Sequence, residues 1–104
     1  MSGAPTGELV DRVAEAVRSV PGVVDLHGGA LGEAVTLLPG RRVAGIRQSD
    51  DDTEVHISVE HGSRIREVAD AVRQSVRAVT GSAVTVVVED VVVPDEDPAA
   101  DLPS

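Results

Sequence analysis

Residues 54–93 read EVHISVEHGSRIREVADAVRQSVRAVTGSAVTVVVEDVVV, and this stretch decides the predicted fold. Its first part, Glu54–Glu60, alternates apolar and polar residues as a half-buried strand does. Apolar residues then recur at helical spacing, with Ser63 as the expected N-cap and Gly81 as the stop signal. Alternating valines predict a last strand over Ala83–Val93. A strand, a helix and a strand in this order predict a right-handed parallel crossover.

The same periodicities assign the faces of these elements. In the strand, Val55, Ile57 and Val59 are expected to face inward, and Glu54, His56, Ser58 and Glu60 outward. The apolar face of the helix consists of Ile65, Val68, Ala69, Val72, Val76 and Val79.

Upstream residues predict a second helix and a hairpin. Helical spacing of apolar residues runs over Glu8–Val20, and Val23–Leu26 is compatible with a short strand. Arg42–Gln48 is predicted to pair with Glu54–Glu60 across the acidic connection 50–53. The expected fold is α+β: a two-layer domain in which two helices cover one face of a small three- or four-stranded mixed sheet, in the order α-β-β-β-α-β.

The composition limits the number of domains and the classes of binding partner that we expect. We expect one domain over residues 8–94, between a disordered N-terminus, 1–7, and a disordered acidic tail, 95–104. The formal net charge is −9 and there are no aromatic residues, which disfavours nucleic acid and base-stacking platforms. The absence of cysteine excludes disulfides and thiolate chemistry. We expect neither a secretory signal nor a membrane-spanning segment in this sequence. Direct insertion into a membrane is therefore not expected either.

Three patterns that resemble ligand sites are better explained as ordinary structure. Asp50, Asp52 and Glu54 have the spacing of early calcium-loop ligands, but the Gly and the Glu that complete such a loop are missing. His56 with Glu54 and Ser58 would form only a weak metal site on an exposed strand face. The glycines of 28–32 lack the spacing of a phosphate loop.

No catalytic constellation is apparent. The only imidazoles are His27, His56 and His61, and no nucleophile elbow accompanies them. We therefore predict a protein that is not an enzyme and that uses no cofactor or metal.

One charged line stands out on the second predicted helix. Arg66, Asp70, Arg73 and Arg77 follow one another at helical spacing, away from the apolar face. Guanidinium groups arranged in this way could bind an acidic protein partner through paired hydrogen bonds. The alternative is a solvated face with Arg66–Asp70 and Asp70–Arg73 pairs, each of which contributes little.

The order of segments and the residues at their joints resemble a known family. The residues that carry the resemblance are Val20-Pro21-Gly22-Val23, Gly62, Ile65, Val68, Val72, Val76, Thr80-Gly81, Val84-Thr85-Val86 and Glu89-Asp90-Val91. In these features the chain is similar to the alkaline-shock, or Gls-type, envelope stress response proteins of Gram-positive bacteria, as a short actinobacterial-like member.

The resemblance implies a cytoplasmic, non-enzymatic adaptor that works in cell-envelope homeostasis. Its implied partners are family paralogues and a membrane-spanning anchor protein, which would hold it at the inner face of the membrane as a homo- or hetero-oligomer. Two other functions stay open on the residues alone: a small regulatory ligand-binding domain, and an RNA-binding module that would use the arginine line.

Overall fold

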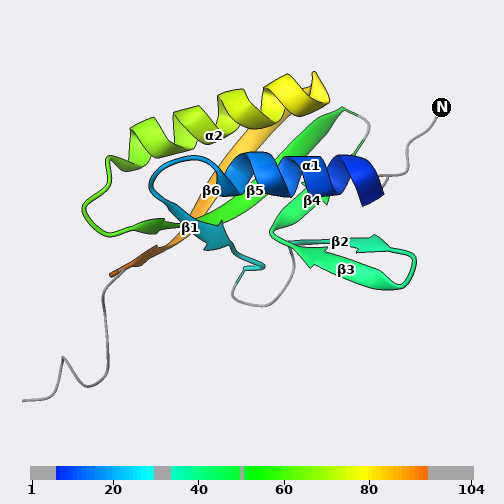
Figure 1. The fold of residues 1–104 in the computed structure, drawn as a ribbon, viewed down its shortest axis with the longest axis horizontal. Coiled ribbons are helices and arrows are strands. Elements are labelled where there is room, and N and C mark those ends of the chain that lie inside the picture. The colour runs from blue at the N-terminus through cyan, green and yellow to red at the C-terminus, as the bar shows by residue number, and fades with distance from the viewer. Residues whose placement is uncertain (1–6, 30–33, 50, 94–104) are drawn as a thin grey trace, which may run out of the picture.

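The computed structural model describes residues 7–29, 34–49 and 51–93, which form two layers (Figure 1). Two helices lie on one face of a four-stranded mixed sheet, and a separate two-stranded hairpin lies beside it. The predicted α+β class and the general order of helices and strands are therefore confirmed, although five strands rather than three lie between the two helices in the described residues. The elements are α1 (Gly7–Arg18), β1 (Val23–Leu26), β2 (Val35–Leu38), β3 (Arg41–Ala44), β4 (Ile46–Gln48), β5 (Asp52–Glu60), α2 (Ile65–Thr80) and β6 (Ala83–Val92).

Strand β5 is the centre of the sheet. One of its edges pairs antiparallel with β1 near its C-terminal end and with β4 near its N-terminal end. The other edge pairs in parallel with β6 along the whole strand. The helix α2 connects β5 to β6, so the predicted parallel crossover is present.

The core lies between the sheet and both helices, as the periodicity predicts. Val55, Ile57 and Val59 of β5 are fully buried beneath the helices. Branched aliphatic side chains fill nearly all of the space, because the chain has no aromatic residues. The buried cluster consists of Val10, Val13, Ala14, Val17, Val20, Ile46, Val55, Ile57, Val59, Val68, Val72 and Val76.

The ends of the helices differ from the predictions in detail. Helix α1 ends at Arg18, before the predicted Val20. The N-cap of α2 is Arg64, without a capping side chain, so the prediction of Ser63 is wrong. Ile65, expected on the apolar face, is 41% exposed because it lies in the first turn beyond the edge of the core. Gly81 ends α2 as predicted, with a left-handed φ of 71° and its N–H donated to the carbonyl of Arg77.

The predicted strand Arg42–Gln48 is not one strand. Gly45, with a φ of 90°, breaks it into two pieces. The first piece, Arg41–Ala44, turns away from β5 and pairs with Val35–Leu38 instead. Only Ile46–Gln48 keeps the predicted pairing with β5. A residue in the left-handed region cannot continue a regular strand, which explains the break.

Most of the predicted flanking segments lie outside the described residues. This holds for 1–6 of the N-terminus and for the whole acidic tail, 95–104. Gly7 already belongs to α1, one residue before the predicted domain boundary.

Candidate protein-interaction surface

The charged line predicted from the sequence lies on the exposed face of α2. The helix rotates by about 100° per residue, so offsets of three and four residues keep side chains on one line. The four side chains of this line are exposed to solvent, and they lie on the sides of the helix that do not carry the buried Val72. We call Arg66, Asp70, Arg73 and Arg77 the arginine face.

Only one ion pair forms within the arginine face. Arg73 Nη1 lies 2.8 Å from Asp70 Oδ1, and Gln74 donates a hydrogen bond to the other carboxylate oxygen. Across residues 7–29, 34–49 and 51–93, neither Arg66 nor Arg77 has an ion-pair partner. The predicted Arg66–Asp70 pair is thus not formed. Two guanidinium groups remain available to an incoming acidic group.

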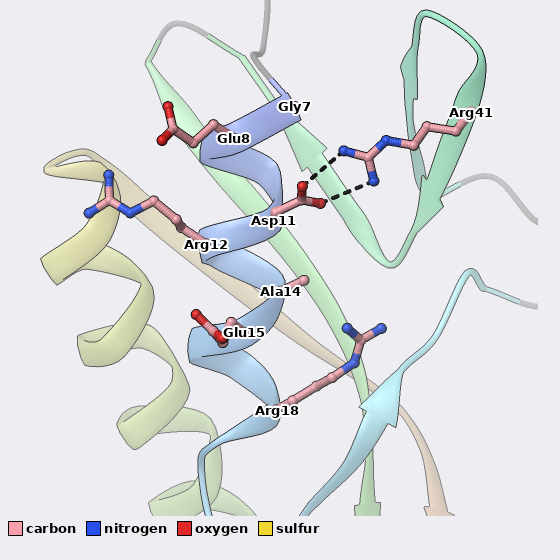
Figure 2. A pocket seen from close by; sticks show the side chains of 8 residues that line it. All are labelled: Gly7, Glu8, Asp11, Arg12, Ala14, Glu15, Arg18 and Arg41. Atoms are coloured by element: carbon pink, nitrogen blue, oxygen red, sulfur yellow. Dashed lines mark hydrogen bonds and ion pairs between the residues drawn. The ribbon is translucent and has the colours of Figure 1, made fainter.

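A second charged surface joins α1 to the β2–β3 hairpin (Figure 2). Arg41 Nη1 and Nη2 donate to the two carboxylate oxygens of Asp11 at 3.1 and 3.0 Å, so the pair is bidentate. Arg18 Nε lies 3.1 Å from Asp25 on β1. Burial pushes the pKa of Asp25 upward, but the Leu26 N–H and Arg18 outweigh it and hold that pKa below its ordinary value.

The groove between these elements is open and carries both charges. It is lined by Gly7, Glu8, Asp11, Arg12, Ala14, Glu15, Arg18 and Arg41. Acidic and basic side chains both line it, and Asp11 and Arg41 already pair with each other. The groove therefore shows no preference for a negatively or a positively charged ligand. Sequence reasoning missed this surface because Arg41 reaches Asp11 from a hairpin that the periodicity does not predict.

His56 departs most from its predicted environment. It lies on the sheet face opposite the helices, but it is only 6% exposed, as is Ser58, so the prediction of a flat exposed face is wrong. Nε2 lies 2.5 Å from Glu54 Oε2 and Nδ1 lies 2.5 Å from Glu89 Oε2. Burial opposes protonation, but these two hydrogen bonds outweigh it and raise the pKa of His56.

The His56 cluster is not arranged as a metal site. Its carboxylates bind opposite nitrogens of one ring, so their oxygens do not converge on a common point. Within the described part of the chain, no group of three or more His, Asp or Glu side chains could hold a metal ion. Asp50 of the calcium-like spacing lies outside that part.

Within the described ranges, neither of the other two histidine rings is hydrogen-bonded to a hydroxyl or a carboxylate group. His27 Nδ1 accepts a hydrogen bond from the Gly29 N–H, within the glycine-rich connection. His61 donates its backbone N–H to Val92 and so joins the ends of β5 and β6. Residues 30–32 of the glycine-rich segment lie outside the described residues.

Comparisons with family models, with curated proteins and with solved structures each give no match to this chain. None of the helices in the described ranges has the length and apolar character needed to span a bilayer.

Proposed function

We propose that the chain is a non-enzymatic adaptor domain that binds other proteins, in the envelope stress response or in envelope homeostasis. One observation carries the proposal of protein binding. A chain with a net charge of −9 places three arginines together on one exposed helix face, and two of them lack an ion-pair partner among the described residues. Such a face suits acidic protein segments better than nucleic acid, because the chain has no aromatic side chain on which bases could stack and its net negative charge most strongly repels a densely charged phosphate backbone.

The cellular setting rests on the resemblance to the alkaline-shock family. Under this proposal the domain self-associates and docks to a membrane-anchored partner, which brings it to the inner face of the membrane. Membrane attachment would then come from the partner and not from lipid binding, since anionic lipid repels an acidic protein.

Fractionation tests the adaptor proposal directly. A tagged copy is expressed with and without a candidate membrane-spanning partner, chosen from any neighbouring gene whose product has transmembrane segments, and membranes are pelleted at low and moderate salt. We expect the tagged chain in the membrane pellet only when the partner is present. Pelleting without the partner, or no pelleting with any neighbouring membrane protein, would contradict the adaptor function.

A further inference from the structure

Strand β6 leaves one edge of the sheet open. Over residues 7–29, 34–49 and 51–93, β6 pairs with β5 alone. Along an edge strand, about every second residue points its N–H and C=O away from the sheet. The first part of β6, Ala83–Val88, carries no charge and no proline, which are the usual protections of such an edge. It can therefore accept another strand.

The arginine face lies beside this open edge. Helix α2 packs against α1 and, within the sheet, on β6 more than on β5, with Val72 buried beneath it. Ala71 lies about 100° to one side of Val72, where it lines a groove with Val20 and Pro21 at the end of α1. Arg73 lies about 100° to the other side. That side faces away from α1, over the free edge of β6.

The direction of α2 places two arginines over the uncharged part of β6. Because α2 returns between two parallel strands, its C-terminal end lies near the start of β6 (Figure 1). Arg73 and Arg77 belong to the C-terminal half of α2. A strand added beside Ala83–Val88 would therefore lie next to both guanidinium groups.

The charge of the arginine face distinguishes between the strands that could pair with this edge of β6. A second copy that paired its own β6 here, with its helices on the same side, would bring two arginine faces together. Each face carries three arginines against one aspartate, so the two would repel. An acidic segment would instead meet positive charge along the helix side. Self-association of this chain would then use another surface.

We infer that the edge of β6 and the arginine face of α2 together form a docking site for an acidic, extended segment of a partner protein, which binds by adding a strand to the sheet. The inference rests on the proposed adaptor function and specifies how the partner is held. Backbone hydrogen bonds to β6 supply affinity, and the arginines select the side chains.

The geometry also fixes the pattern of the segment. Successive side chains of a strand point to opposite faces of the sheet. On the helix side, acidic residues meet Arg73 and Arg77. On the opposite side, apolar residues lie beside Val87, which pairs with His56 in the register of the sheet. The preferred segment alternates acidic and apolar residues.

Labelled synthetic peptides test the mode of binding on the full chain. The probe is a short capped peptide in which Glu and Val alternate, and its binding is followed by fluorescence anisotropy. One control peptide has the same composition with the acids grouped at one end, and another carries N-methyl groups on alternate amides. We expect both controls to bind more weakly by about tenfold or more. Hydrogen exchange should show new protection at amides of Ala83–Val88 upon binding of the probe.

Matched charge reversals test the arginine face. Arg73→Glu with Arg77→Glu should weaken probe binding by about tenfold or more. Arg12→Glu with Arg42→Glu makes the same change in net charge at exposed arginines elsewhere, and it should leave binding nearly unchanged. Equal effects of the two double variants, equal binding of the N-methylated peptide, or unprotected β6 amides would each overturn the inference.

Two other occupants give distinct results. If a second copy covers the edge, protection of β6 will rise with protein concentration without peptide. If the acidic tail covers it, a chain that lacks 95–104 will bind the probe more tightly and lose protection at β6. Either result overturns the choice of a partner segment. If a membrane partner captures the chain with β6 unprotected and Arg73→Glu/Arg77→Glu without effect, the adaptor function stands and strand addition fails.

Discussion

Nδ1 of His56 on β5 lies 2.5 Å from Oε2 of Glu89 on β6, at the point where the register of the two strands shifts. Glu54 occupies the other ring nitrogen, and Arg47 of β4 lies 3.8 Å from Glu54. A neutral imidazole has only one N–H, so it can donate to only one of these carboxylates. When the ring is protonated, both of its nitrogens carry a hydrogen, so His56 can donate a hydrogen bond to each carboxylate.

The cluster predicts stability that falls as the pH rises. The pKa of His56 is raised in the folded chain, so its contribution is complete below the unfolded value of about 6.5. The contribution is lost as the pH rises through the higher folded pKa. We expect the free energy of unfolding, measured in urea, to decrease over this interval.

Two variants separate this effect from the titration of the rest of the chain. His56→Gln keeps a polar side chain without the charge, and it should remove most of the pH dependence while costing about 1–3 kcal/mol at low pH. His61→Gln, at an exposed residue, should retain the pH profile of the parent. A His56→Gln profile parallel to that of the parent would show that other groups cause the decrease.

Gly45 should tolerate substitution much less well than Gly40. Both have positive φ, of 90° and 79°, so alanine is strained at either position. At Gly45 an added Cβ would lie 2.7 Å from Leu26 Cβ and 3.1 Å from the His56 carbonyl oxygen, whereas nothing lies within 4 Å at Gly40. Gly40→Ala should cost about 1 kcal/mol. Gly45→Ala should cost clearly more in the same urea titrations, and equal costs would mean that the backbone relaxes at the break.

The sequence was informative where one periodicity ran without interruption. The regularly spaced valines of β5, α2 and β6 predicted both the parallel crossover and the buried face of each element. Each element must bury the face on which its apolar side chains recur. The β2–β3 hairpin was not predictable in this way, because its strands are four residues long and separate from β4 at a single glycine. The arginine face was visible as a helical line, but its position beside an open edge requires the tertiary packing.

The burial of His56 could not be read from the sequence either. The alternation of β5 correctly assigns His56 to the face opposite the helices. Whether that face is covered depends on Glu89, which is distant in the sequence and reaches the ring at the shift in register. Local patterns carry no information on such a contact.

The acidic tail should be dispensable for folding. Within residues 7–29, 34–49 and 51–93, the last strand ends at Val92 and the whole buried cluster precedes that residue. Residues 95–104 combine acids with prolines and offer no apolar periodicity to a core. A chain that ends at Pro94 should keep the circular dichroism spectrum and the cooperative melting curve of the parent. A broadened or lower transition would show that the tail contributes to the fold.

Two neighbouring residues on α2 should differ greatly in how much an acidic substitution destabilises the fold. Val72 is fully buried, so Val72→Asp places an unpaired carboxylate in the core at a cost of several kcal/mol. That cost is comparable to the total stability of about 5–15 kcal/mol expected for a domain, so the variant should be largely unfolded. Arg73→Glu, one residue further, loses only the exposed pair with Asp70, which contributes about 0.2–1 kcal/mol. Circular dichroism and urea titration should therefore find the first variant unfolded and the second close to the parent. Similar stabilities for the two variants would mean that the helix is rotated relative to the sheet, which would also remove the arginine face from the edge of β6.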